Sequence, residues 1–293
     1  MFKPSTTGAL MVVLSAVCFS AKAVFAKLAY RFGADPTTVL GLRMAFALPF
    51  FALVAMRPRA PLEQAMTKRE LLQFFVLGSF GYYLASLFDF LGLAYVSAGL
   101  ERLILFLYPT IVIAFNALFY RERVGRRLWQ AVVLGYSGVG LVVWSDRAIG
   151  GSNLALGSGL VFLGAIVYAF YLSGSQPLIM RHGSMRVTSC VLVVACTIAI
   201  VQFLLMRGLQ PISVEVIWLA AATGVVATVI PAFLLTAGIK RLGASRASLI
   251  GTAGPVSTLL LAHEFLDEPV TWLQLAGSAL VLLGVFRVSQ GRG

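Results

Sequence analysis

The sequence predicts an all-α integral membrane protein in which ten transmembrane helices form two inverted-topology five-helix repeats around a central cavity. Three observations support this fold class: the composition, ten apolar runs of membrane-spanning length, and a similarity between the two halves of the chain. Of the 293 residues, 59% are hydrophobic and 12% are charged, and the mean hydropathy is +0.92. One soluble core cannot bury so much apolar surface, so lipid must cover the remainder.

A spanning helix needs about 20 mostly apolar residues. Such runs, separated by polar residues or by Gly and Pro, occupy residues 8–30, 36–56, 71–95, 98–120, 128–146, 155–176, 187–206, 213–239, 245–266 and 271–289. Each run is predicted to be one span. The first run also resembles a signal peptide, because Lys3 precedes it and Ala21-Lys22-Ala23 fits a cleavage pattern. We expect it to be retained, since the apolar stretch continues to Tyr30.

The second half of the chain repeats the first. A shift of 146 residues aligns residues 92–122 with 238–268 without a gap and with seven identities, which include Gly92/Gly238, Pro109/Pro255 and Glu122/Glu268. A shift of 149 places Gly8 on Gly157 and Lys22 on Tyr171. Because each half has an odd number of helices, residues 1–150 and 151–293 are predicted to be repeats of opposite orientation. Inverted repeats let a secondary transporter expose one site to each side in turn.

The distribution of Lys and Arg predicts the orientation. If the N-terminus is cytoplasmic, the inner loops and ends hold 16 Lys and Arg residues and the outer ones hold four, which are Arg31, Arg102, Arg147 and Arg207. Cytoplasmic loops carry the excess of positive charge, so both termini are expected inside the plasma (bacterial inner) membrane. The net charge of +12 lies in short loops rather than on one face, so we expect no nucleic-acid partner.

Several motifs occur in both halves. The first half has the run LGLAYVSAGL at 91–100, followed by Tyr108-Pro109, Glu122, Trp129-Gln130 and Gly140, and Arg43 stands in its second helix. The second half has Ala244, Pro255, Glu268, Trp272, Gln274, Gly277 and Gly284. Over the whole chain these residues resemble the EamA-type drug/metabolite transporter superfamily. The resemblance implies the ten-helix inverted-repeat fold and export of amino acids or related metabolites.

Two segments depart from the pattern of that superfamily. Many members have a tryptophan in the first helix where this chain has Cys18-Phe19, and the fourth helix begins with the charged run Leu100-Glu101-Arg102. Ionisable groups inside apolar spans are costly and therefore mark candidate sites. Arg43, Glu101 and Arg102 are predicted to form a charge network or gate in the outer half of the membrane. Lys22 and Asp89 lie at the same depth, and either bracing ion pairs or substrate contact would explain the five charges.

Polar and aromatic residues recur at helical spacing in three of the predicted helices. The stripes are Ser15, Cys18 and Lys22; Ser79, Tyr82, Ser86 and Asp89; and Gly164, Tyr168, Tyr171 and Ser175. Steps of three and four residues place each stripe on one helix face, and those faces are too polar for lipid. The predicted substrate-binding residues are Lys22, Tyr82, Tyr83, Ser86, Asp89, Tyr108, Tyr168 and Tyr171, although aromatic packing is the alternative role for the tyrosines.

Pro109 and Pro255 are predicted to lie inside the fourth and ninth helices, where each removes a backbone hydrogen bond. Their symmetric placement predicts paired hinges, with static curvature as the alternative. Cys18, Cys190 and Cys196 fall in apolar segments without metal-ligand spacing, so neither disulfides nor a metal nor another cofactor is expected.

These predictions favour a secondary transporter that exports amino acids, aromatic or large neutral ones among them, or similar small metabolites by alternating access. Its expected partners are the small-molecule substrate and the lipid bilayer. A nucleotide-sugar or drug carrier of the same fold is the alternative within transport. A membrane-embedded enzyme is a further alternative, but the one acidic pair near a histidine is Asp267-Glu268 beside His263, and we expect no enzyme.

Overall fold

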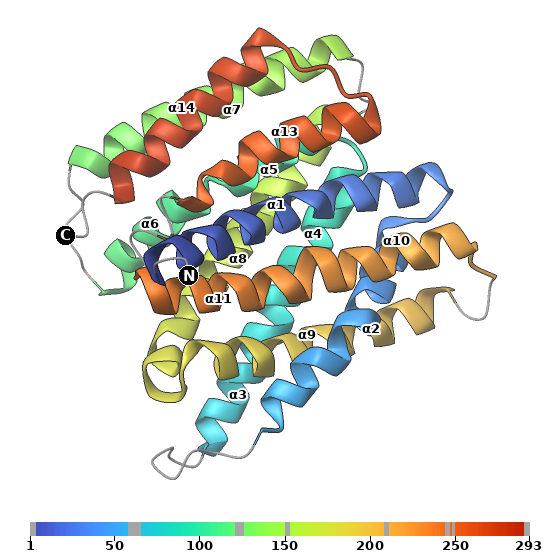
Figure 1. The fold of residues 1–293 in the computed structure, drawn as a ribbon, viewed down its shortest axis with the longest axis vertical. Helices are drawn as coiled ribbons and strands as arrows, with labels where there is room; N and C mark the ends of the chain where they lie inside the picture. The colour runs from blue at the N-terminus through green and yellow to red at the C-terminus, as the bar shows by residue number, and fades with distance from the viewer. Residues whose placement is uncertain are drawn as a thin grey trace.

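The computed structural model describes residues 4–57, 66–120, 126–149, 153–207, 211–243, 247 and 250–289, and the elements in this part of the chain are helices (Figure 1). The first half contains α1 (Pro4–Arg31), α2 (Pro36–Ala55), α3 (Lys68–Val76), η1 (Leu77–Tyr83), α4 (Leu84–Leu93), α5 (Ala98–Leu105), α6 (Tyr108–Tyr120) and α7 (Arg126–Ile149). The second half contains α8 (Leu154–His182), α9 (Ser184–Arg207), α10 (Val214–Gly224), η2 (Val225–Val229), α11 (Ile230–Leu242), α13 (Ala253–Leu266) and α14 (Trp272–Ser289). The symbol η marks a π-helix.

Helices lie within each of the ten predicted ranges. Within the described residues, seven helical segments are long and apolar enough to cross a membrane: Thr6–Arg31, Pro36–Ala55, Lys68–Leu93, Ala98–Phe115, Leu154–His182, Ser184–Met206 and Val214–Leu242. The remaining three ranges are filled by α7, α13 and α14, of which α14 contains a shorter apolar stretch, Trp272–Arg287. The chain is therefore a multi-pass integral membrane protein.

The third and eighth predicted helices each contain a π-helical segment. Seven residues in η1 and five in η2 widen the helix locally, and residues 225–229 align with 79–83 under the shift of 146. Thr228 Oγ1 donates a hydrogen bond to the carbonyl of Thr223, five residues earlier (2.8 Å). Such π-segments are rare and often lie at functional sites.

Pro109 and Pro255 lie close to an interruption in the fourth and ninth predicted helices. Pro109 is the second residue of α6 and Pro255 the third of α13, so each lies in the first turn of a new helix and not in mid-helix. The helix is interrupted before each of them, at Phe106 (φ −66°, ψ −3°) and Thr252 (φ −64°, ψ −10°). Proline is tolerated in a first turn because the N–H it lacks would have no partner there. The two interruptions are 146 residues apart and therefore match the symmetric placement of the prolines, whose role as hinges stays a prediction.

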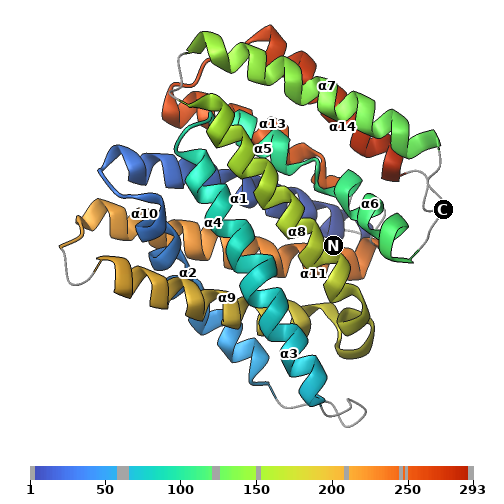
Figure 2. The same ribbon diagram turned by 180° about the vertical axis from the view of Figure 1, so that it is seen from behind.

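Helices of the two halves pack against one another in matching pairs. α1 packs on α11 and α13, and α8 packs on α4, α5 and α6. α2 packs on α9, and α7 runs beside α14 along one edge of the molecule in both views (Figures 1 and 2). The packing of α1 on the second half thus corresponds to the packing of α8 on the first half when the halves are exchanged.

Two of these contacts use equivalent residues. A Cβ added to Gly92 would lie 2.6 Å from Val161 Cγ2 and 2.7 Å from the Gly157 carbonyl. A Cβ added to Gly238 would lie 2.5 Å from Val12 Cγ2 and 3.2 Å from the Gly8 carbonyl. Small residues let transmembrane helices approach closely. The positions that the shifts of 146 and 149 pair in sequence therefore form the same contact twice.

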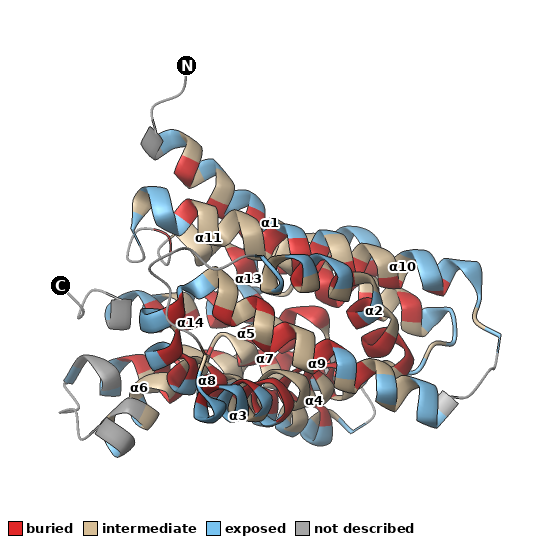
Figure 3. Cartoon of the chain, turned by 90° about the horizontal axis from the view of Figure 1, so that it is seen from below, coloured by how far each residue is buried: buried red, intermediate tan, exposed pale blue. Residues whose placement is uncertain are grey.

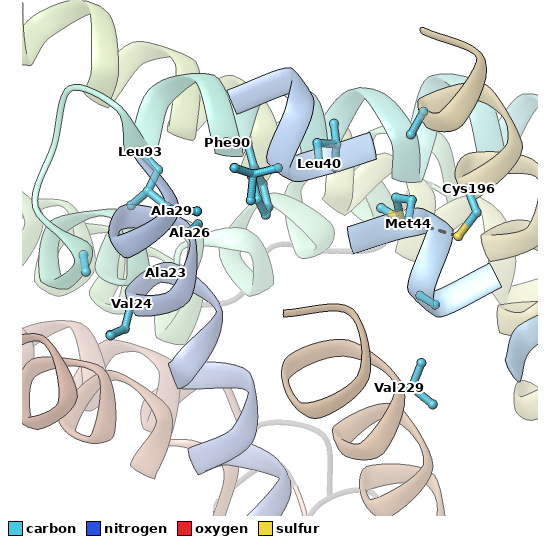
Figure 4. Close-up of a cluster of buried hydrophobic side chains, with 14 of the residues drawn as sticks. Ala23, Val24, Ala26, Ala29, Leu40, Met44, Phe90, Leu93, Cys196 and Val229 are labelled. Atoms are coloured by element: carbon cyan, nitrogen blue, oxygen red, sulfur yellow. Dashed lines mark hydrogen bonds between the residues drawn. The ribbon is translucent and has the colours of Figure 1, made fainter. Parts of the chain in front are cut away.

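Burial follows the expectation for a bundle surrounded by lipid. In Figure 3 buried residues face the interior and exposed residues the outside of the bundle. Large apolar side chains lie on that exterior, among them Trp144, Trp218 and Trp272. The main core cluster, shown in Figure 4, contains Phe90 between residues of α1 and α2, and Cys196 contacts Met44 (3.5 Å). Cys18, Cys190 and Cys196 are free thiols.

Candidate functional site

A buried triad of charged residues joins α1, α4 and α5. Lys22 Nζ donates to Asp89 Oδ2 (2.5 Å) and to Glu101 Oε1 (2.8 Å). The three residues are 8%, 5% and 0% exposed. Ser97 caps α5 by accepting from the Leu100 N–H (3.0 Å), which sets the first turn of α5 and with it Glu101. The structure thus brings together three of the five predicted charged residues.

The triad holds one cation and two carboxylates. Asp89 Oδ1 and Glu101 Oε2 are sealed from solvent and have no hydrogen-bond partner within the described residues. An ammonium has three donors, so Lys22 can donate a hydrogen bond to both acids at once, although its single charge balances only one of them. Removing one member of such a cluster would leave uncompensated buried charge, whereas the complete cluster ties three helices together.

Arg43 on α2 lies next to the triad but outside it. Its guanidinium carbon is 5.1 Å from the centroid of the Phe90 ring, and Lys22 Nζ is 5.9 Å from the same centroid. Arg43 Nε donates to Thr228 Oγ1 in η2 (2.9 Å). No described carboxylate lies within 4.0 Å of this guanidinium, since the ion pairs of the described residues involve other cations. Lys22 and Arg43 together balance Asp89 and Glu101.

Arg102 belongs to a different environment. Its guanidinium lies 5.9 Å from the Phe106 ring centroid, at the interruption between α5 and α6. A Cβ added to Gly254 would lie 2.9 Å from Arg102 Nη2, so the glycine makes room for the guanidinium. Arg102 contacts α13 and has no ion pair with the triad acids. The predicted five-residue network is therefore a triad, a neighbouring arginine and a separate one.

Four tyrosines from η1, α6 and α8 form an aromatic cluster. Tyr168 lies 5.4 Å from Tyr108, 5.7 Å from Tyr171 and 6.4 Å from Tyr82 between ring centroids, and Tyr82 lies 5.6 Å from Tyr171. Three of the contacts are edge-to-face, the arrangement that aromatic pairs prefer. The rings fill the space between these helices, where the sequence predicts a cavity wall.

The other members of the predicted stripes are also interior. Tyr82 and Tyr83 pack against the main core cluster that contains Phe90, and Ser86 is buried on α4. Ser79 donates to the carbonyl of Phe75 (2.6 Å), and Ser15 donates to the carbonyl of Pro231 (2.8 Å). The stripes therefore face protein rather than lipid, as their polarity predicts.

A pocket of about 290 Å³ lies between the C-terminal ends of α1 and α13 and is lined by Lys27, Tyr30, Arg31, Ala94, Leu266 and Glu268. Lys27 Nζ contacts Glu268 Oε1 (2.8 Å), and both Glu268 carboxylate oxygens accept from the Ala98 N–H (3.0 and 3.1 Å). Glu268 thus anchors the start of α5 to α1. Lys27 was not among the predicted site residues, although it is a second lysine inside the first apolar run.

A second charged cluster lies at the start of α3 and the end of α8. Glu70 Oε1 is 3.0 Å from both Arg181 Nη1 and His182 Nε2, and Glu70 forms a capping box with Thr67. This cluster could not be predicted from the sequence, because residues 112 positions apart give no local signal. No group of three or more potential metal ligands occurs within the described residues.

Comparisons with known proteins agree with this architecture. The EamA-like transporter family matches the chain twice, at residues 6–144 and 155–290. An uncharacterized transporter of Bacillus subtilis, YcbK, is 32% identical over 305 residues, which cover 99% of this chain and 93% of the relative. A probable amino-acid metabolite efflux pump of Salmonella typhimurium is 26% identical over 264 residues, which cover 86% of this chain and 84% of the relative.

A solved crystal structure shares the fold, with a TM-score of 0.65 and 17% identity over 96% of each chain. The matched family and the named relatives are transporters and not enzymes.

Proposed function

The chain belongs to the EamA-like transporter family, and on that basis we propose that it is a secondary transporter that exports amino acids or similar small metabolites by alternating access. The observation that carries the proposal is the buried Arg43 beside the Lys22–Asp89–Glu101 triad, inside helices that otherwise face lipid and apolar core. Ionisable groups at that depth are retained for function or for specific bracing. The relative named an amino-acid metabolite efflux pump supports the same substrate class.

The proposed architecture is ten spans in two inverted repeats, residues 1–150 and 151–293. The two separate family matches support the duplication. The matching helix pairs and the repeated glycine contact support an exchange symmetry between the halves. Five helices per repeat then require opposite orientations, which is the arrangement that allows a central site to open to either side.

The tyrosine cluster is proposed to line the substrate path. Tyr82, Tyr108, Tyr168 and Tyr171 come from both halves and offer flat apolar surfaces, which suit aromatic or large neutral amino acids. In this conformation the rings contact one another and close the path. The interruptions at Phe106 and Thr252 and the π-segments provide places where the helices could bend.

Counterflow into proteoliposomes tests the function. Vesicles loaded with an unlabelled amino acid should accumulate the labelled form of the same compound, with phenylalanine, tryptophan, leucine and alanine as the panel and protein-free vesicles as the control. We expect accumulation of at least the aromatic or large neutral members. Accumulation of a labelled nucleotide sugar or a cationic drug instead would move the protein to the alternative substrate class, and no accumulation of any amino acid would contradict the proposal.

Thiol labelling tests the proposed orientation, with both termini in the cytoplasm. Single cysteines are introduced at Arg69 and Arg126 in a variant that lacks Cys18, Cys190 and Cys196. In intact cells they should resist a membrane-impermeant thiol reagent and react only after the membrane is opened. A cysteine at Arg147, on the proposed outer side, serves as the control that should react at once. Labelling of the first two sites in intact cells would contradict the orientation.

A further inference from the structure

In this structure Lys22 is not available to bind a substrate, because its ammonium is already paired with two carboxylates. Its Nζ contacts Asp89 and Glu101 at 2.5 and 2.8 Å, and the triad is nearly sealed from solvent. A substrate carboxylate brought to Lys22 would meet two negative charges at hydrogen-bond distance from the same nitrogen. The electrostatic cost in an apolar interior is large. A carboxylate-binding group must therefore be sought next to the triad.

Arg43, unlike Lys22, keeps most of its N–H donors without an acceptor among the described residues. A guanidinium carries five N–H donors, and of these one, on Nε, is used by Thr228 within the described residues. The four N–H groups on Nη1 and Nη2 have no acceptor in that part of the chain. Among the described residues, the side-chain atoms that are inaccessible to solvent and lack a hydrogen-bond partner include oxygens of Asp89 and Glu101. They include no nitrogen of Arg43. The Nη groups therefore reach space that a water-sized molecule can enter, although the residue as a whole is only 4% exposed.

Two neighbours hold the guanidinium in a fixed orientation. Thr228 accepts from Nε, and its own proton is directed to the carbonyl of Thr223 (2.8 Å), so the hydroxyl cannot turn away. Phe90 packs against the guanidinium, with the ring centroid 5.1 Å from Cζ. One edge of the fork is thus fixed and the two Nη groups are left as a planar pair, the geometry that binds a carboxylate in bidentate fashion.

We infer that Arg43 binds the carboxylate of the transported molecule through its two Nη groups, with Thr228 and Phe90 as positioning residues. This inference rests on the proposed function for its place in the transport cycle. It names the ligand class, a small carboxylate with an apolar body that the neighbouring Tyr82 can contact, since Tyr82 and Phe90 belong to the same core cluster. A zwitterionic amino acid fits best, because Lys22 and Arg43 already balance Asp89 and Glu101 and a neutral ligand preserves that balance.

The inference is tested by ligand-induced thermal stabilisation of the full-length protein in lipid nanodiscs. The probes are L-phenylalanine and 3-phenylpropionate, each paired with its amide, which has the same shape without the negative charge. Both acids should raise the Tm of the wild type and both amides should not. In Arg43→Gln the apparent Kd for the acids should rise about 10-fold or more, because charge-assisted hydrogen bonds are lost.

Matched variants separate binding from folding. Arg147→Gln makes the same substitution at an exposed arginine beside Trp144 and should keep the wild-type response. Arg43→Lys keeps the charge without the fork and should retain preference for acids over amides at reduced affinity, which covers the case in which Arg43→Gln does not fold. Thr228→Val should weaken acid binding less than Arg43→Gln does.

Equal responses to acids and amides in the wild type would overturn the inference, as would wild-type affinity for acids in a folded Arg43→Gln. Because stabilisation is measured without transport, a failure of counterflow with acid-selective stabilisation intact would count against the proposed function and leave Arg43 as a carboxylate site. Active counterflow that does not depend on Arg43 would support the proposed function and count against Arg43 as the carboxylate site.

Discussion

The two halves of the molecule share their packing but not their charge. Gly92 meets Gly157 and Val161 in the same way as Gly238 meets Gly8 and Val12. By contrast, Lys22, Asp89 and Glu101 of the first half align with Tyr171, Leu235 and Ala247 of the second. The spans 155–176 and 187–206 contain no Asp, Glu, Lys or Arg at all. The frame is therefore duplicated, whereas the buried charges occur once.

This difference indicates which features the fold needs and which the site needs. Close helix approach is a requirement of the frame, so small residues are found at both equivalent positions. Burying charge carries a desolvation penalty, and a second triad at the equivalent position would add that penalty again. The buried charges therefore occur in one half only, beside the one candidate site. The second half offers an aromatic residue, Tyr171, at the position equivalent to Lys22, and that tyrosine joins the four-ring cluster.

The largest expected effect on stability comes from removing the cation of the first half's buried triad. Lys22→Met leaves Asp89 and Glu101 buried without their cation, which should cost about 3–5 kcal/mol and reduce the yield of folded protein. Tyr171→Phe, at the equivalent position of the second half, should fold like the wild type. Thermal melting in detergent with size-exclusion chromatography provides the measurement.

The triple variant Lys22→Met/Asp89→Asn/Glu101→Gln completes this prediction. Removing all three charges should restore most of the folded yield, because no carboxylate remains buried without its cation and Arg43 keeps its hydrogen bond to Thr228. The double variants Lys22→Met/Asp89→Asn and Lys22→Met/Glu101→Gln each retain one acid, which Arg43 still balances in charge, and should also recover folded yield relative to Lys22→Met. A triple variant as unstable as Lys22→Met alone would mean that the charges are not the source of the instability.

The next effect should be equal in the two halves. Gly92→Ala and Gly238→Ala each place a Cβ within 2.7 Å of a neighbouring atom, so both should destabilise by about 1–3 kcal/mol. Gly159→Ala and Gly140→Ala are the controls, since nothing lies within 4 Å of an added Cβ there. They should be neutral or slightly stabilising, because Ala favours helix. A large effect at one of Gly92 and Gly238 alone would break the structural equivalence of the halves.

The tyrosine cluster gives an effect on transport. Tyr82→Ala and Tyr168→Ala open the contact between η1 and α8, and both should lower counterflow several-fold while the protein still folds in detergent. Trp218→Ala removes an exposed aromatic residue on the lipid-facing side and should leave counterflow unchanged. If both tyrosine variants transport at the wild-type rate, the cluster serves packing and not the substrate path.

Much of the fold could be predicted from the sequence, because hydropathy and repeat shifts are properties of long segments. Helices lie in all the expected ranges, and the glycines paired by the shifts make equivalent contacts. Pro109 and Pro255 each lie three residues after an interruption of their predicted span, and their role as hinges stays a prediction. The π-helical segments η1 and η2 could not be predicted, because no sequence pattern marked them.

The site could be predicted by residue type but not by partner. Burial cost alone identifies Lys22, Arg43 and Asp89 as candidates. Which cation pairs with the two carboxylates depends on distances of a few ångströms between α1, α4 and α5. Sequence spacing does not give these distances. The link between Arg43 and Thr228 joins residues 185 positions apart, so it too required the structure.

The smallest expected effect lies at the turns that follow α1 and α8. Gly33 (φ 80°) and Gly183 (φ 79°) follow α1 and α8 with nearly the same φ, and after Gly33 the Asp35 side chain caps α2 by accepting from the N–H groups of Thr37 and Thr38 (3.0 Å each). Partial burial raises the pKa of Asp35, but the hydrogen bonds from Thr37 and Thr38 outweigh it and hold that pKa below 3.8.

The ionised Asp35 therefore stabilises the fold above about pH 4, and this contribution is lost as the pH falls through the lowered pKa. Asp35→Ala should cost about 1 kcal/mol at neutral pH, and the cost should decrease as the pH falls through the lowered pKa of Asp35. Melting curves of both proteins across this range provide the measurement, with Asp35→Asn as a capping control that does not ionise. A difference between wild type and Asp35→Ala that does not change with pH would contradict the assignment.

The central claim is that the charges of the first half divide into a closed brace, the triad, and an open ligand, Arg43. It is tested most directly by counterflow of labelled phenylalanine through the folded triple variant and through Arg43→Gln, side by side in proteoliposomes. The triple variant should transport at about half the wild-type rate or more, and Arg43→Gln should fall to about a tenth or less. A triple variant that folds but does not transport, or an Arg43→Gln protein that transports like the wild type, would contradict this division.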